Sequence, residues 1–199
     1  MKGYTTVVKI ENYLLTNVAA YFHTQVEEWI ASMENYVEKI TGRVFIADTV
    51  ASTRKYDGLD VSETFPTAGA NDLYIDDCVS VTSLYIEDNL IDPTDYVLYP
   101  ANELPKTRIR LLEDSGESFM AGEQEIDVTA KWGYSVAVPS DIEFATTVLT
   151  SGIVNYSNLA EGEVKSENIG SYSVTYKDEK QWQDFERAKE ILAMYTTSL

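Results

Sequence analysis

Apolar residues recur at steps of three and four over residues 22–40, which is the spacing of one face of a helix. The opposite side of this stretch carries Glu27, Glu28, Glu34 and Glu38, and Gly42 follows as a typical helix stop. The pattern predicts an amphipathic helix with a solvated acidic face. A shorter helix is predicted before it, over about residues 10–17.

After Gly42 the sequence changes to short runs of β-branched and aromatic residues separated by turn formers. Strands are predicted at about 43–46, 51–56, 73–75, 79–87, 96–99, 107–112 and 126–134. Asp57-Gly58 predicts a hairpin turn, because both residue types tolerate positive φ, and Asp92-Pro93 predicts a further turn. Because these runs do not alternate with helices, they predict a meandering antiparallel region and not a doubly wound parallel sheet.

Helical spacing returns after Pro139, where Ser140 and Glu143 form a capping-box signature. The predicted helix has one face of small uncharged residues, which suits close packing: Thr146, Thr147, Thr150 and Ser151. A hairpin is predicted over 164–176 and a last amphipathic helix over about 181–196. The fold class is therefore α+β, with amphipathic helices from the two ends of the chain packed together and a central meandering antiparallel β region.

The length of 199 residues fits one domain, spanning 1–199, with a β-rich insertion at about 44–134 between the helical parts. A lone cysteine, Cys78, allows no internal disulfide and is expected to be a small core residue with a raised pKa. No window approaches the ~18 apolar residues of a membrane span, and the amino terminus lacks the apolar core of a signal peptide. We therefore expect a protein made in the cytoplasm, with no membrane partner.

Charge is strongly unbalanced, since 15 Lys and Arg stand against 33 Asp and Glu and leave a formal net charge of −18. Affinity for DNA comes largely from cations that displace phosphate counterions, so this balance disfavours a protein that grips nucleic acid. It suits plain solubility, or a surface that DNA passes without adhering to it.

The distribution of charge is also uneven. Between Tyr56 and Pro105 there are 11 acids and no Lys or Arg, and a basic row follows at Lys106, Arg108 and Arg110. Alternate residues of a strand project from one face, so this row is a candidate for pairing with an acidic patch on a neighbouring copy. Pairing with acids of its own sheet is the alternative.

The residues give little support to catalysis or to a bound cofactor. His23 is the only histidine, so neither a two-histidine zinc motif nor a Cys/His metal cluster can be assembled, and a serine or cysteine triad would depend on His23. No GxGxxG pattern and no P-loop occur. Asp88, Asn89, Asp92 and Asp95 gather oxygen ligands without the spacing of an EF-hand, and a solvated acidic turn is the alternative to an ion site there. We expect no catalytic residues, no metal and no cofactor.

Three stretches, taken in order, resemble the head-tail connector proteins of long-tailed bacteriophages, also called adaptor or head-completion proteins. The first joins a helix ending in ITGRVF (40–45) to RKYDG (54–58) and LYIDDCVSVT (73–82). The second is VTAKWGY (128–134), running into Val138-Pro139 and a helix, and the third is VKSENIGSYSVTY (164–176). The β region over 44–134 is longer than minimal members of that family carry, so no contacts are transferred there.

The resemblance implies a non-enzymatic structural protein of the virion neck. It implies a closed ring beneath the portal protein, twelvefold if it follows the symmetry of the portal. It also implies a tail-side neck or tail-completion protein as second partner, and DNA as the passing content of an acidic channel. Aromatic and apolar side chains of the last helix are candidates for the portal or tail contact: Trp182, Phe185, Leu192 and Tyr195. Ordinary core packing is the alternative for these side chains.

Two other classes of function are kept open by the sequence. One is a β-rich carbohydrate- or receptor-binding module, in which exposed Tyr and Trp would line a groove. The other is an enzyme acting through paired carboxylates. Rings seen by native mass spectrometry or microscopy indicate a connector, sugar binding by a monomer indicates the module, and hydrolysis lost with one carboxylate indicates the enzyme.

Overall fold

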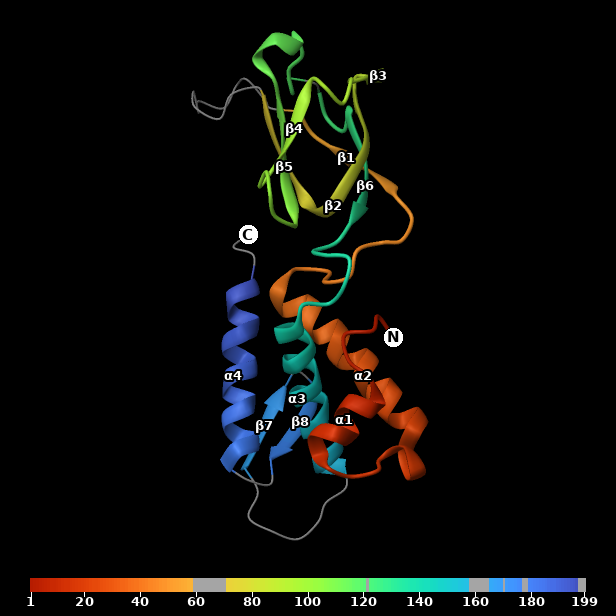
Figure 1. Ribbon diagram of the computed structural model, residues 1–199, viewed down its shortest axis with the longest axis vertical. Helices are drawn as coiled ribbons and strands as arrows, with labels where there is room; N and C mark the ends of the chain where they lie inside the picture. Colours follow the sequence, from red (N-terminus) through yellow and green to blue (C-terminus); the bar gives the residue numbers. More distant parts are fainter. Residues whose placement is uncertain (59–70, 121, 158–164, 170, 177–178, 197–199) are drawn as a thin grey trace. The chain divides into compact units, whose positions relative to one another are not determined.

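Helices from both ends of the sequence and strands from its middle form two separate units in the computed structural model of Figure 1. The helical unit combines Met1–Phe45 with Val138–Leu199, and the β unit is Ile46–Ala137. The structure describes residues 1–58, 71–120, 122–157, 165–169, 171–176 and 179–196. The predicted α+β class, with a central antiparallel sheet, is confirmed.

The amino-terminal half of the helical unit consists of α1 (Val7–Leu14) and α2 (Ala19–Thr41). α1 begins three residues before the predicted start, because the Thr6 side chain accepts a hydrogen bond from Lys9 N and caps it. α2 ends where predicted. Gly42 takes a φ of 70°, which glycine adopts without a Cβ clash, and its N–H donates to the Glu38 carbonyl at 2.8 Å.

The predicted faces of α2 need two corrections. Ile40, expected in the apolar stripe, is 37% exposed at the last turn. Glu34, expected on the solvated acidic face, is fully buried, because the segment before α1 packs on this part of α2. The Glu34 carboxylate accepts the backbone N–H groups of Lys2 at 2.6 Å, Gly3 at 2.8 Å and Tyr4 at 2.9 Å.

α3 (Ser140–Ser157) is the central helix of this unit and contacts α1, α2 and α4. Its small polar face is buried as predicted, at Thr146, Thr147, Thr150 and Ser151. The hydroxyls of the three threonines donate to carbonyls one turn earlier in α3, which satisfies them inside the unit.

The carboxy-terminal elements are a hairpin and a helix, as predicted. β7 (Lys165–Ile169) pairs antiparallel with β8 (Tyr172–Tyr176), and β8 contacts α3 and α4 (Figure 1). α4 (Glu179–Tyr195) packs on α3 and α2 and buries Phe185, Ala188, Ile191 and Leu192.

The β unit is one curled sheet of six strands in the order β1-β6-β2-β5-β4, with β3 paired to β2 (Figure 1). The strands are β1 (Ser52–Tyr56), β2 (Asp72–Ile86), β3 (Asn89–Leu90), β4 (Tyr96–Tyr99), β5 (Lys106–Leu111) and β6 (Ile126–Trp132), and a short 3-10 helix, η1 (Glu113–Ser115), follows β5. The inner face buries a cluster drawn wholly from residues 73–132, with Trp132, Phe119, Ile109 and Leu84 among its largest members. This unit therefore has a core of its own.

The strands predicted at 73–75 and 79–87 are one continuous strand. β2 pairs with β5 over Asp72–Cys78 and with β6 from Cys78 to Ile86, with register shifts between Tyr74 and Cys78 and again before Ser83. The polar pair Asp76-Asp77, which lies between the two predicted strands, is at this irregularity. An interrupted alternation here marks bulges and a bend, not the end of a strand.

Two further predictions, of a strand and of a hairpin turn, are wrong. Residues 43–46 form no strand beyond an isolated bridge between Ile46 and Ser135. Asp57 and Gly58 form no turn: β1 pairs with β6, far along the sequence, and Gly58 N donates to the Gly122 carbonyl at 3.1 Å. Close to the bridge, Gly133 has a φ of 136°, and a Cβ there would lie 2.5 Å from Ala47 Cα, so only glycine fits.

Candidate functional site

The basic row predicted on one strand face lies on β5. Ile109 and Leu111 point into the core, and Lys106, Arg108 and Arg110 alternate with them on the outer face. Register places Arg110 opposite Asp72 and Arg108 opposite Tyr74 on β2. The alternation alone was sufficient to predict that these three cations share a face.

Asp72 is the carboxylate that faces the basic row. Its Oδ1 lies 3.7 Å from Arg108 Nε, and its Oδ2 lies 3.7 Å from Arg110 Nη1. Lys106 Nζ donates instead to the backbone carbonyls of Pro100 and Ala101. Pairing within the sheet, the alternative left by the sequence, therefore occurs at Asp72. Pairing with a neighbouring copy stays a prediction.

Arg108 is flanked by two tyrosines that the sequence did not associate with it. Its guanidinium lies 4.6 Å from the centre of the Tyr99 ring on β4 and 6.0 Å from that of Tyr74 on β2. Tyr74 is 68% exposed, although it sits in the middle of a sheet. The register of β2 and β4 on β5 produces this arrangement, and local sequence carries no signal for it.

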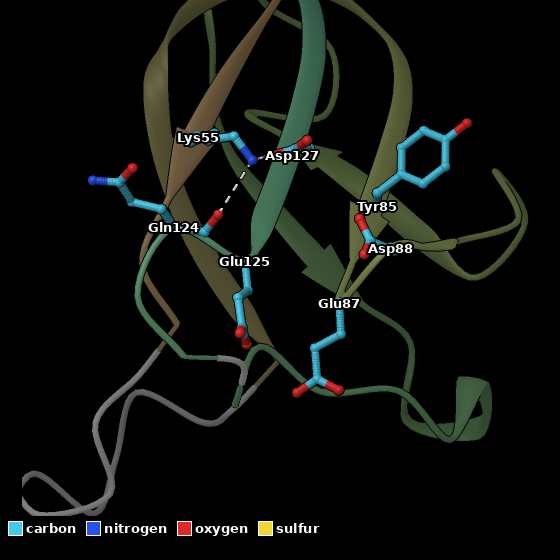
Figure 2. Close-up of a pocket in the computed structure, with 7 residues that line it drawn as sticks. All are labelled: Lys55, Tyr85, Glu87, Asp88, Gln124, Glu125 and Asp127. Carbon is cyan, nitrogen blue, oxygen red and sulfur yellow. Dashed lines mark hydrogen bonds and ion pairs between the residues drawn. The ribbon is translucent and has the colours of Figure 1, made fainter.

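Acidic side chains gather at another part of the β unit, around the β2–β3 turn (Figure 2). A pocket of about 500 Å³ is lined by Lys55, Tyr85, Glu87, Asp88, Gln124, Glu125 and Asp127. Lys55 Nζ donates to Asp127 Oδ1 at 2.9 Å, and this ion pair raises the pKa of Lys55. The pocket thus holds four carboxylates and one lysine that is already paired.

The backbone around this pocket is tightly turned. Glu87 and Asp88 have φ values of 49° and 65°, and Gln124 has a φ of 57°. These left-handed conformations are uncommon for residues other than glycine. The two acids of the hairpin turn are held at fixed positions by the β2–β3 ladder, in which Ile86 pairs with Asn89.

The candidate contacts of α4 divide into two groups. Phe185 and Leu192 are buried inside the helical unit, so they follow the core-packing alternative. Trp182 and Tyr195 are partly exposed. Tyr195 also has structural partners: its hydroxyl donates to Asp141 Oδ2 at 2.9 Å, and its carbonyl accepts from Arg43 Nε at 2.8 Å.

The segment from Asp88 to Asp95 forms a polar turn. Asp92 Oδ1 accepts hydrogen bonds from Thr94 N at 2.9 Å and from the Thr94 hydroxyl at 2.7 Å, which lowers the pKa of Asp92. Within the part of the chain that the structure describes, no three His, Cys, Asp or Glu side chains are grouped so that they could hold a metal ion. None of the described helices has the length and apolar character needed to cross a membrane.

A carbohydrate-binding module, the alternative kept open by the sequence, would need exposed Tyr and Trp side chains along a groove. Trp132 is only 2% exposed, and the Arg54 guanidinium covers its ring at 4.5 Å while it pairs with Asp76 at 2.7 Å. The pocket of Figure 2 is lined mainly by charged side chains, with Tyr85 as its aromatic member.

Cys78 is a core residue, and burial raises the pKa of its thiol to about 11, with Asp77 adding to the rise. The unfolded chain releases this proton near pH 8.5, whereas the folded chain holds it. The thiol therefore contributes stability that is complete below about pH 8.5 and is lost as the pH rises to about 11.

We expect urea unfolding to show a steeper loss of stability above pH 8.5 for the wild type than for Cys78→Ala. We also expect a thiol reagent to label the unfolded chain at pH 7.5 but not the folded one. Rapid labelling of the folded chain would contradict the burial of this thiol.

Comparison with known proteins places the fold in a class seen in particle necks. No protein-family model and no curated protein matches the chain. A solved structure described as the neck of an empty GTA (gene transfer agent) particle computed with C6 symmetry matches 97% of this chain and 89% of its own, with 16% identity and a TM-score of 0.54. A second, the neck of a native GTA particle computed with C12 symmetry, covers 97% and 88% at 16% identity with a TM-score of 0.46. The resemblance to neck proteins is confirmed at the level of fold.

Proposed function

We propose that this chain is a structural protein of a virion neck, where it forms a closed ring that joins the DNA-filled head to the tail. The observation that carries this proposal is the extent of the fold match. It covers 97% of the chain, and so includes the β unit as well as the helices. The first of the matching structures is a particle neck of sixfold symmetry, which is compatible with a ring of twelve copies.

The charge of the chain supports passage of DNA through such a ring. A net charge of −18 repels a polyanion, so DNA in the channel would slide past the subunits with few counterion-releasing contacts. The role is structural and not enzymatic, and DNA is the content of the channel.

Docking to the portal protein on one side, and to a tail-side neck or tail-completion protein on the other, completes the role. Trp182 on α4 is the side chain best suited to such a contact, because it is aromatic and partly exposed. Tyr195 is a second candidate, whereas Phe185 and Leu192 support the helix from inside the unit.

The proposal is tested in the particle whose genes encode this chain. Deleting the gene should give filled heads and free tails that do not join, and electron microscopy of wild-type particles should place the chain in the neck. Trp182→Ala should reduce joining, while Glu190→Gln, an exposed substitution on the same helix, should not. Density for the chain in the capsid shell or at the tail tip would overturn the proposal.

A further inference from the structure

The basic row of β5 is not neutralised within its own unit. Residues 46–137 contain 18 Asp and Glu against 6 Lys and Arg, and three of those six cations stand together on β5. Among the described residues, Asp72 is the one carboxylate in an ion pair with this row, and it lies 3.7 Å from both arginines. A strongly acidic unit thus carries one spot with a surplus of positive charge.

The side chains at this spot are arranged as an anchor. Tyr99 and Tyr74 flank Arg108 on neighbouring strands, so its guanidinium is held in place with little further loss of conformational freedom on binding. Arginine and tyrosine, together with tryptophan, are enriched at the energetic centre of protein interfaces. Tyr74 is exposed over most of its surface, and Arg110 beside it is also exposed.

A surface of opposite charge lies on the same unit. The acidic pocket of Figure 2 brings together Glu87, Asp88, Glu125 and Asp127, and Lys55 offsets only one of these charges. Asp72 and Tyr74 lie at the start of β2, whereas Tyr85 lies next to its last residue, Ile86, and Glu87 follows the strand. The two surfaces are therefore distinct patches on one sheet.

We propose that the outer face of Lys106, Arg108 and Arg110, with Tyr74 and Tyr99, docks on the acidic pocket of a second copy of this chain. Two different complementary patches on each subunit make a head-to-tail contact, which closes into a ring when the rotation between copies allows it. The proposal rests on the ring proposed above and assigns its subunit contact. The negative potential of the acidic unit disfavours DNA as the occupant of the basic face. The acidic pocket that would bind this face is present on each copy of the chain.

Charge exchange tests this contact in the full-length chain. Sedimentation velocity over a concentration series at low salt should show self-association that weakens as salt is added. Arg108→Glu with Arg110→Glu should weaken it at least tenfold, and so should Glu87→Lys with Glu125→Lys. The chain with all four substitutions, in which the charges are exchanged, should regain affinity to within about threefold of the wild type.

Matched controls separate the contact from net charge and from folding. Glu113→Lys with Asp114→Lys changes the charge of the same unit by the same amount as Glu87→Lys with Glu125→Lys, at exposed positions of η1, and should leave association at least as strong as in the wild type. Thermal unfolding shows that each variant is folded, and recovery in the fourfold variant excludes misfolding as the cause of the loss.

Three results would overturn the contact. The first is that the wild type does not self-associate up to its solubility limit. The second is that the fourfold variant does not regain self-association. The third is that Arg108→Glu with Arg110→Glu abolishes binding to a short DNA duplex but leaves self-association unchanged. The last result assigns the face to nucleic acid. Imaging of the particle tests the neck role independently. If the chain lies in the neck and the charge-reversed variants self-associate like the wild type, this contact is excluded but the neck role is not.

Discussion

Truncation after Lys180 is expected to unfold the helical unit while the β unit stays folded. The deletion removes α4 with its buried side chains Phe185, Ala188, Ile191 and Leu192. Loss of one large buried side chain costs about 2–5 kcal/mol, so three of them together approach or exceed the ~5–15 kcal/mol that stabilises a whole domain. The core of the β unit comes entirely from residues 73–132 and loses no contact of its own cluster.

Circular dichroism and an amide NMR spectrum measure this outcome. We expect the helical signal to fall by far more than the deleted part of α4, residues 181–195, accounts for, together with retained dispersed amide peaks from the β unit. Trp182→Ala in the full chain is the matched control, because it changes a partly exposed side chain of the same helix and should keep both units folded. A loss confined to the deleted residues would show that α1, α2 and α3 fold without α4.

The same reasoning changes how a portal contact of α4 can be tested. A truncated chain that no longer attaches to the portal would report loss of the fold, not loss of an interface. Tyr195 has a related difficulty, since its ring packs edge-on against Phe45 at 5.3 Å and its backbone carbonyl holds Arg43. Trp182 is the position at which a point substitution separates contact from folding most cleanly.

The helices could be predicted from the sequence because their signals are local. The apolar spacing located α2 and α4, the left-handed position of Gly42 located the end of α2, and the small residues of α3 anticipated its burial. A helix is closed by hydrogen bonds to residues four positions away, so a short window contains most of what determines it.

Strand pairing was less predictable, because the partners of a strand lie far away in the sequence. Two strands were predicted at 73–75 and 79–87, whereas β2 is continuous because β5 and β6 pair with it on either side of Cys78. For the same reason Asp57-Gly58 predicted a local hairpin, whereas β1 pairs with β6, with Ser52 opposite Ala130 and Tyr56 opposite Ile126. The turn residues carried no information about that distant partner.

The candidate site shows the same division. Alternation along one strand predicted the shared face of Lys106, Arg108 and Arg110. The tyrosines around Arg108 and the acids of the pocket come from different strands, so their proximity depends on register and on the bend of β2. The composition showed a surplus of acidic residues but not which of them would lie close together in the fold.

Glu34→Ala is expected to destabilise the helical unit by about 3 kcal/mol or more. Its carboxylate is the acceptor for three consecutive backbone N–H groups, and the Tyr4 N–H is buried where water cannot replace the bond. Hydrogen bonds to a charged acceptor contribute about 1.5–3 kcal/mol, and each buried donor left without a partner costs about 1–3 kcal/mol. Glu34→Gln should cost less stability, because its one side-chain oxygen can still accept from the Gly3 and Tyr4 N–H groups. Only the bond from the Lys2 N–H is lost, since the glutamine NH₂ that faces it is also a donor.

Urea unfolding with matched substitutions identifies which interaction holds the segment before α1. Glu28→Ala, at an exposed position of the same helix, should change stability by no more than about 0.5 kcal/mol. Lys2→Ala removes the ion pair with Glu38 but keeps the Lys2 backbone N–H, so it should cost less than about 1 kcal/mol. If Lys2→Ala proved as damaging as Glu34→Ala, the ion pair and not the captured backbone would hold the segment. The segment would then be held by a charge on the surface of α2, which is the role that the sequence predicted for this acidic face.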